Sequence, residues 1–226
     1  MDGIDKLERM DTDEFRRMPL MGILRGGDVE VIEPLVEAVT AAGLETLEVA
    51  MNTPDAVGII RRAREVAGER LTIGAGTVLS PDLLESALEA GATFIVLPTL
   101  VPVVVERCRA RDIPVFPGAL TPQEIHDAWS AGATMVKVFP AKVFGPQYLR
   151  EIKGPFDDVE LLACGGVSAT NLESFFSCGA SAVAFGGSIF TAERLAGGDF
   201  AAIGKGIEEL VAAFTLLDPP LPRIGR

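Results

Sequence analysis

Histidine and cysteine are scarce in this chain of 226 residues. It contains one histidine, His126, and three cysteines, which have no Cys-x-x-Cys spacing. A single imidazole excludes metal sites and catalytic triads that need several histidines, so acid–base chemistry must rest on Glu, Asp, Lys or Tyr. The odd, scattered cysteines suit reduced thiols better than a disulfide framework, which predicts a cytoplasmic protein.

Basic side chains are fewer than acidic ones, and long apolar runs are absent from the sequence. Lys and Arg number 20 against 32 Asp and Glu, a net charge of −12, which argues against nucleic acid or an anionic membrane surface as a partner. No apolar run approaches the roughly 18 residues that a membrane-spanning helix needs. With 48% hydrophobic and 23% charged residues the composition is globular. Any anionic ligand must therefore be bound by a few well-placed local groups.

A repeated pattern of helix ends and strands organises the chain. Four helical runs end in a small residue and glycine, the usual helix stop, and an apolar strand follows each within a few residues. Eight apolar strands are predicted in all, at residues 20–24, 46–49, 71–75, 94–97, 113–116, 135–138, 160–164 and 182–185. Helix-start signals follow several of them, at Thr53, Ser80, Thr121 and the segment 168–171. Alternating strands and helices predict a parallel sheet covered on both faces.

Eight strand–helix units fit a single α/β domain, a (β/α)₈ TIM barrel, which usually has about 200 to 250 residues. We expect a short N-terminal helical extension over residues 1–18, the barrel over 19–217 and a tail over 218–226. A doubly wound open sheet is the alternative fold. It is disfavoured because the segment Gly74-Ala75-Gly76 has Leu79 where a dinucleotide-binding fingerprint needs its third small residue.

Two charged residues stand inside apolar strands, Lys137 in the sixth and Glu48 in the second. A lysine pointing into a dry barrel favours its neutral amine, which is a nucleophile towards carbonyl groups. Burial raises the pKa of a carboxyl group towards the range of a proton shuttle, which fits Glu48. One inward amine and one inward carboxylate predict Schiff-base chemistry, whereas a purely structural salt bridge between them is the alternative.

Other candidate residues lie where strands end, which is where barrels carry their active sites. Arg25 follows the first strand and is suited to clamp a carboxylate, and the Thr77 hydroxyl follows the third; a rim salt bridge and a turn hydroxyl are the competing interpretations. Paired glycines follow the last two strands, where backbone N–H groups commonly bind phosphate. The predicted phosphate-binding residues are Gly165, Gly166, Ser168, Gly186, Gly187 and Ser188.

At these residues the sequence resembles the class I 2-keto-3-deoxy-6-phosphogluconate (KDPG) and 4-hydroxy-2-oxoglutarate (KHG) aldolase family, from about Pro19 to Phe214. The resemblance is carried by the segments 22–26, 48–49, 74–78, 136–141, 165–167 and 186–188. It implies that Lys137 forms the Schiff base with pyruvate, Glu48 is the general acid/base, Arg25 and Thr77 hold the pyruvyl carboxylate, and the glycine loops hold phosphate. It also implies a homotrimer that works without a metal or other cofactor.

The implied reaction is reversible cleavage of a 2-keto-3-deoxy-6-phospho sugar acid to pyruvate and glyceraldehyde 3-phosphate, with 4-hydroxy-2-oxoglutarate as a further substrate. Asn52 and Thr53 stand where gluconate-type members usually have Arg-Thr, so this stretch is more similar to the phosphogalactonate branch. Two rival functions use the same barrel. One is a phosphosugar isomerase or epimerase with Glu48 as its base, and the other is a barrel that only binds sugar phosphates.

Overall fold

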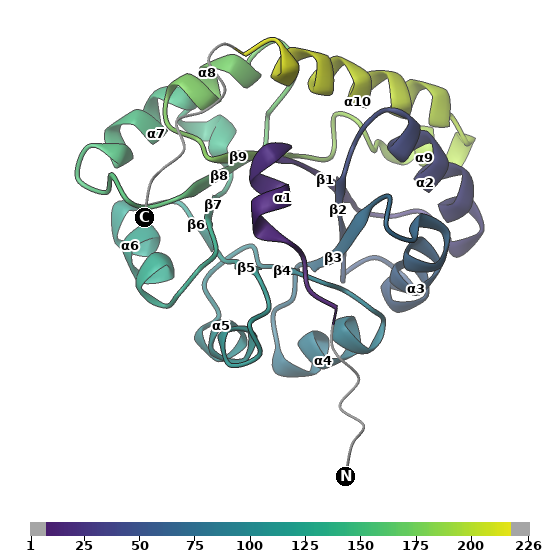
Figure 1. The fold of residues 1–226 in the computed structure, drawn as a ribbon, viewed down its shortest axis with the longest axis horizontal. Helices are drawn as coiled ribbons and strands as arrows, with labels where there is room; N and C mark the ends of the chain where they lie inside the picture. The colour runs from purple at the N-terminus through teal and green to yellow at the C-terminus, as the bar shows by residue number, and fades with distance from the viewer. Residues whose placement is uncertain (1–7, 218–226) are drawn as a thin grey trace.

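Parallel strands alternate with helices in the computed structural model, which describes residues 8–217. The predicted tail at 218–226 and the first seven residues of the predicted N-terminal extension lie outside the described residues. The strands form a ring with the helices around it (Figure 1). The strands are β1 Leu20–Leu24, β2 Thr46–Ala50, β3 Thr72–Gly76, β4 Ile95–Val96, β5 Val115–Phe116, β6 Gly118–Ala119, β7 Val136–Val138, β8 Leu161–Cys164 and β9 Ala182–Phe185. This confirms the predicted TIM barrel.

The helices that follow the strands along the chain, α2 to α10, form the outer layer of the barrel, while α1 precedes β1. The helices are α1 Thr12–Arg17, α2 Ile32–Ala41, α3 Ala56–Ala67, α4 Pro81–Glu89, α5 Pro102–Arg109, α6 Pro122–Ser130, α7 Pro146–Lys153, α8 Leu172–Ser177, α9 Ala192–Gly197 and α10 Phe200–Thr215, with short 3₁₀ turns η1 Val29–Val31 and η2 Ala141–Val143. Within residues 8–217, none of these helices has the length and apolar character to cross a membrane.

The strand count differs from the eight predicted because the fifth barrel strand is in two parts. β5 and β6 flank Pro117, which has no N–H to donate and so interrupts the ladder. β5 pairs with β4 and β6 pairs with β7, in the order β5-β4-β3-β2-β1-β9-β8-β7-β6. The two halves together nearly close the ring. The Pro117 carbonyl still accepts a hydrogen bond from the Lys137 N–H at 2.9 Å, which ties β7 to this strand.

Two apolar cores hold the fold together. The larger lies between the outward faces of the strands and the helices, and the smaller fills the inside of the barrel. The inner core consists of Met10, Phe15, Met21, Phe94, Val96, Phe116, Met135, Leu162, Cys164, Ala182 and Ala184, with Ile23 packed against it. Side chains on a strand alternate between the two faces, so every second strand residue points inward. Glu48 and Lys137 therefore stand in a ring of apolar neighbours.

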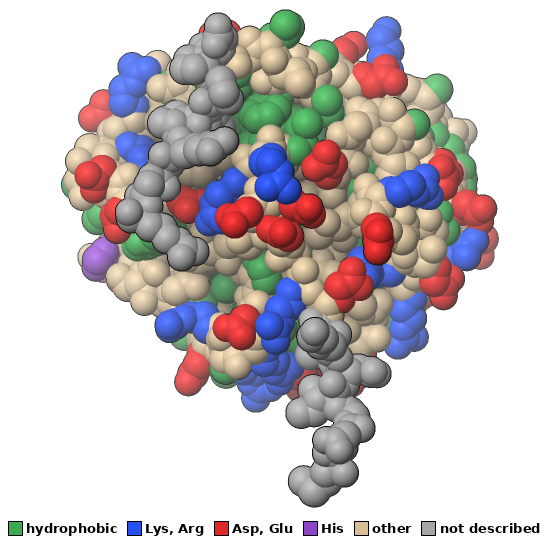
Figure 2. Space-filling model, viewed as in Figure 1, with side chains coloured by type: hydrophobic (Ala, Val, Ile, Leu, Met, Phe, Trp, Pro, Cys, Tyr) green, Lys and Arg blue, Asp and Glu red, His purple; other side chains and the backbone are tan. Residues whose placement is uncertain are grey.

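Helix α1 covers the amino-terminal end of the barrel, at the centre of the face seen in Figure 1. Its one buried residue, Phe15, packs edge to face on Phe116 with ring centroids 5.8 Å apart. The Met10 N–H donates to the Thr93 carbonyl at 3.1 Å, just before β4. Acidic and basic side chains mix at the centre of this face (Figure 2). Ligands must therefore reach the barrel interior from the opposite, carboxyl-terminal end.

Of three predicted helix-start residues, two cap a helix as expected and one does not. The hydroxyl groups of Ser80 and Thr121 accept N–H groups at the starts of α4 and α6, as predicted. The Thr53 prediction is wrong, because Asp55 caps α3 instead. The Thr53 hydroxyl has another partner, the N–H of Gly26 at 3.0 Å. Thr53 thus connects the loop after β1 to the loop after β2 by a hydrogen bond, instead of capping a helix.

Candidate functional site

The predicted site residues converge on the carboxyl-terminal end of the barrel. Arg25 directly follows β1 and Thr77 directly follows β3, while Glu48 and Lys137 stand within β2 and β7. The two glycine loops follow β8 and β9. Because all strands are parallel, these positions lie at one end of the sheet, the end that α1 leaves open.

Glu48 and Lys137 face each other across the barrel interior. Their side chains are 1% and 8% exposed, and the Lys137 Nζ lies 3.8 Å from the Glu48 Oε2. The strands place them there by register, since Glu48 pairs with Ile23 and Gly74 while Lys137 pairs with Gly118 and Leu162. An amine and a carboxylate are thus held together in a nearly dry site, close enough to exchange protons through a bound substrate or water.

The carboxyl group of Glu48 is the most strongly buried acid of the site. Burial raises its pKa above the ordinary value, and the positive charges of Lys137 and Arg25 oppose that rise. Its Oε2 has no hydrogen-bond partner within residues 8–217. Gly76 makes room for the carboxyl group, since a methyl group added there would lie 1.7 Å from the Oε1. A buried acceptor without a partner is unusual in a folded protein, and a catalytic role is one of its explanations.

Lys137 has two further neighbours in the barrel. Its Nζ lies 5.7 Å from the ring centroid of Phe139, which is 41% exposed at the end of β7. The Cys164 thiol, on the inward face of β8, is close enough for the Lys137 charge to affect it, but burial dominates and raises the pKa of this thiol to about 11. The sequence pattern indicated only that this cysteine is a reduced thiol. Its place two residues beyond the inward Leu162 puts it in the wall of the site.

Arg25 and Thr77 stand at the rim next to Glu48. Arg25 is exposed and forms no ion pair among the described residues, so the alternative of a structural rim salt bridge finds no support. Its charge nevertheless acts on the Glu48 carboxyl group. Thr77 has a φ of +59°, a conformation unusual for a threonine, and its hydroxyl has no hydrogen-bond partner among the described residues. Strained backbone of this kind is characteristic of ligand-binding positions.

The two glycine loops offer unpaired backbone donors. Gly165 and Gly166 adopt φ values of +98° and +80°, which favour glycine. Within residues 8–217, several N–H groups of these loops donate to no protein acceptor, among them those of Gly166, Val167, Gly187 and Ser188. Ser168 is different, because its N–H donates to the Asn171 side chain at 2.9 Å and its hydroxyl bonds that of Thr170. Free amide donors on two adjacent loops suit an oxyanion.

Each glycine loop is held by one side chain at or near the start of the helix that follows it. The Asn171 side chain accepts from the Ser168 N–H and donates to the Gly166 carbonyl at 2.8 Å. The Arg194 guanidinium donates to the carbonyls of Ser188 and Ile189, at 3.3 and 3.0 Å. Both side chains bond carbonyl groups of the loop. Because a peptide unit is planar, a fixed carbonyl also fixes the N–H group of the next residue.

Lys142 is a residue that the sequence pattern gave no role. It is exposed in η2, as expected of an ordinary loop lysine, but its side chain runs over the first glycine loop. A methyl group added to Gly166 would lie 2.5 Å from the Lys142 Cβ. Its place five residues after Lys137, beyond the turn at Pro140, was the only sequence signal for this contact. It brings a positive charge to the end of the barrel where the free amides lie.

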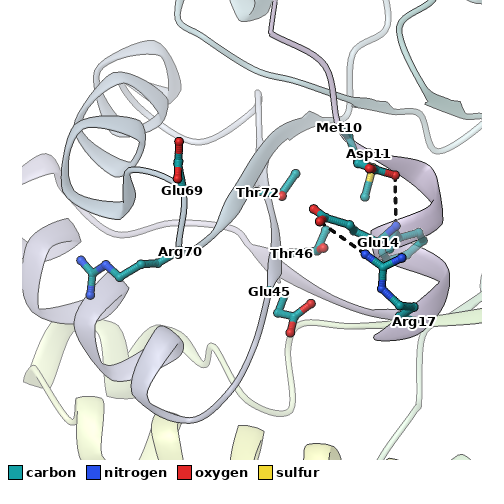
Figure 3. A pocket seen from close by; sticks show the side chains of 10 residues that line it. Met10, Asp11, Glu14, Arg17, Glu45, Thr46, Glu69, Arg70 and Thr72 are labelled. Carbon is teal, nitrogen blue, oxygen red and sulfur yellow. Dashed lines mark hydrogen bonds and ion pairs between the residues drawn. The ribbon is translucent and has the colours of Figure 1, made fainter.

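A separate cavity of about 370 Å³ lies at the opposite end of the barrel, between α1 and the starts of β2 and β3 (Figure 3). Its charged lining residues are Asp11, Glu14, Arg17, Glu45, Glu69 and Arg70. Glu14 pairs with Arg17 and Arg70 pairs with Glu37. The remaining acids would repel an anionic ligand, and neither Glu48 nor Lys137 lines the cavity.

Comparison with known proteins agrees with this geometry. The profile of the KDPG and KHG aldolase family matches residues 12–206. The chain is 33% identical over 177 residues to the 2-dehydro-3-deoxy-6-phosphogalactonate aldolase of Escherichia coli, covering 78% of this chain and 86% of the relative. It is 37% identical over 175 residues to the 2-dehydro-3-deoxy-phosphogluconate aldolase of Pseudomonas aeruginosa, covering 76% and 78%.

A solved structure adds chemical detail. It is a KDPG aldolase from Legionella pneumophila with pyruvate captured at low pH as a covalent carbinolamine intermediate, and it matches this fold with a TM-score of 0.80 at 26% identity, over 87% of this chain and 95% of that chain. The resemblance predicted from the sequence is therefore confirmed, and the chain belongs to the KDPG and KHG aldolase family.

Proposed function

We propose that the chain is a class I aldolase, a lyase that reversibly cleaves a 2-keto-3-deoxy-6-phospho sugar acid of the gluconate or galactonate type to pyruvate and glyceraldehyde 3-phosphate. 4-Hydroxy-2-oxoglutarate is a further substrate, cleaved to pyruvate and glyoxylate. The observation that carries the proposal is the buried pair of Lys137 and Glu48, 3.8 Å apart at the open end of the barrel. An isomerase would use Lys137 only as an electrostatic partner of Glu48, whereas an aldolase uses its amine as a nucleophile.

In the proposed reaction the Lys137 amine attacks the C2 carbonyl carbon and forms a carbinolamine, which loses water to give an iminium ion. The Glu48 carboxylate first takes a proton from the Lys137 ammonium group, which frees the amine to attack, and then gives this proton to the departing hydroxyl group. The carboxylate then takes the proton of the C4 hydroxyl as the C3–C4 bond breaks. The electron pair of that bond moves into the iminium group, giving an enamine and free aldehyde. Protonation at C3 and hydrolysis return the amine and release pyruvate.

We propose that the rim residues bind the two anionic ends of the substrate. Arg25 and the Thr77 hydroxyl hold the carboxylate of the pyruvyl part, and the free N–H groups of the glycine loops hold the phosphate. The exposed Lys142 over Gly166 adds a positive charge to the phosphate end. These local groups offset the net charge of −12, which opposes the approach of an anion.

The imine is tested by trapping. Incubation with pyruvate and borohydride should attach a reduced pyruvyl group to Lys137, located by peptide mass spectrometry. The Lys137→Arg variant keeps the positive charge but cannot form an imine, so it should lose both the adduct and the cleavage activity. An adduct at another residue, or cleavage retained by Lys137→Arg, contradicts the Schiff-base mechanism and favours the isomerase alternative.

The role of Glu48 is tested by displacing its carboxyl group. Gly76→Ala puts a methyl group where the Glu48 carboxyl lies. We expect kcat to fall by about a hundredfold or more, because general acid–base catalysis contributes roughly 10² to 10⁴ in rate. The matched control is Gly197→Ala at the end of α9, where an added methyl group meets no atom within 4 Å. Equal activity of the two variants in steady-state assays contradicts the assignment of Glu48.

The phosphate site is tested by charge repulsion. Ser188→Glu should raise KM for the phosphorylated sugar acids by about tenfold or more, because like charges in a partly desolvated site repel by more than about 1.4 kcal/mol. KM for unphosphorylated 4-hydroxy-2-oxoglutarate should change little. An equal rise for both substrate types contradicts phosphate binding at the glycine loops. The same assay with gluconate-type and galactonate-type acids determines which C4 epimer is preferred.

We also propose that the chain acts as a homotrimer in the cytoplasm, where its three cysteines, all free and buried, stay reduced. Apolar side chains are exposed just after Lys137, with Val143 and Phe144 at 57% and 56% exposure. Such side chains are typical of contact surfaces between subunits. Sedimentation should give a mass of three chains for the wild type and a lower mass for Phe144→Asp. A monomeric wild type contradicts the trimer.

A further inference from the structure

The Thr53 hydroxyl makes a contact that joins two loops of the site. Thr53 is 5% exposed and lies between β2, which carries Glu48, and α3. Its Oγ1 accepts a hydrogen bond from the Gly26 N–H at 3.0 Å. Gly26 directly follows Arg25 in the chain. One buried hydroxyl therefore connects the loop that carries Arg25 to the end of the strand that carries Glu48.

The backbone after Arg25 has little stiffness of its own. Gly26 and Gly27 follow it with φ values of +93° and +88°. Two consecutive glycines have a wide choice of conformations. A Cβ at Gly26 would meet no atom within 4 Å, so packing does not hold this peptide in place. The Arg25 backbone is therefore held by β1 on its amino-terminal side and by the hydrogen bond of Gly26 to Thr53 on its carboxyl-terminal side.

Thr53, in contrast, is firmly fixed. Its N–H donates to the Ala50 carbonyl at 2.9 Å, and its own carbonyl accepts from the Ala56 N–H at 3.2 Å. The first bond attaches it to the last residue of β2, and the second attaches it to the first residue of α3. The hydroxyl consequently keeps a constant place relative to the strand of Glu48.

We propose that Thr53 is a positioning residue that sets the distance between Arg25 and Glu48. The inference rests on the proposed role of Arg25 as the clamp of the pyruvyl carboxylate. Thr53 itself touches neither the substrate nor the reacting atoms. Its hydroxyl holds the guanidinium where it serves two purposes, namely to bind the carboxylate of the substrate and to place a positive charge beside the catalytic carboxyl group.

The effect of the Arg25 charge on Glu48 makes the proposal testable through the pH dependence of activity. Three groups face Glu48 from the surrounding strands: Lys137 on β7, Arg25 after β1 and the Cys164 thiol on β8. The charge of Arg25 lowers the pKa of Glu48 against the effect of burial. When Arg25 is no longer held, that pKa rises further. The acidic limb of the kcat/KM profile, which reports the essential base of the free enzyme, then moves to higher pH.

The test compares Thr53→Val, which removes the hydroxyl at nearly constant volume, with Thr53→Ser, which keeps it. The control is Thr134→Val, since the Thr134 hydroxyl accepts a hydrogen bond from the Val115 N–H at 2.9 Å just before β7, away from the site. The readouts are the pyruvate concentration that half-saturates borohydride trapping at Lys137, the pH profile of kcat/KM and the thermal midpoint.

We expect Thr53→Val to raise the half-saturating pyruvate concentration about fivefold, the usual effect of one hydrogen bond, and to move the acidic limb to higher pH. Thr53→Ser should retain both wild-type values. Thr134→Val should lower the thermal midpoint without either change. If Thr53→Val leaves both values unchanged, or if Thr134→Val shifts them equally, the proposal is overturned.

Two further variants separate this inference from the function on which it rests. Arg25→Ala should raise the half-saturating pyruvate concentration, and adding Thr53→Val to it should cause no further rise, because the hydroxyl then has no guanidinium to position. If Arg25→Ala has no effect, the clamp itself is wrong and the inference is overturned with it. If Arg25→Ala has an effect and Thr53→Val adds to it independently, the clamp stands and only the positioning role is overturned.

Discussion

One buried ion pair, Lys137 with Glu48, sets the main constraint on this structure, because the surrounding barrel of apolar side chains must accommodate two charged groups. Taking two charged groups out of water costs several kcal/mol each, and their attraction offsets that cost only when other groups complete their hydrogen bonds. In this barrel the hydrogen bonds are incomplete, because the Glu48 Oε2 has no partner among the described residues. The pair is therefore poor at stabilising the fold and well suited to receive a substrate.

The surrounding barrel gives this pair its space and excludes water. Glycine replaces larger side chains on the inward face at Gly76, where the Glu48 carboxyl lies, and at Gly118, where an added methyl group would lie 2.2 Å from the Pro98 carbonyl. Phe15 of α1 closes the amino-terminal end against Phe116. Gly76 thus leaves space for the Glu48 carboxyl group near the carboxyl ends of the strands, while the Phe15 ring packs inside the barrel at its other end.

Sequence reasoning succeeded where a local pattern is sufficient. Alternation of apolar strands with helices predicts the barrel, and an inward lysine is conspicuous in any apolar strand. Sequence reasoning failed where contacts between residues far apart in the chain determine the role of a side chain. Thr53 looks like a helix cap from its neighbours, yet its hydroxyl bonds Gly26, 27 residues away. Lys142 likewise crosses Gly166 only because the chain turns back after β7. Such contacts arise from the closure of the barrel rather than from local sequence.

The same contacts connect the loops to catalysis. Thr53 joins the ends of β1 and β2, Asn171 fixes the loop after β8, and Arg194 fixes the loop after β9. Each is a side chain near the start of a helix that bonds the backbone of a glycine-containing loop. Glycine lets backbone N–H groups approach an anion but leaves the loop loosely defined. A polar anchor from the next helix restores that definition, so a chain with net charge −12 needs few cations to hold an anionic substrate.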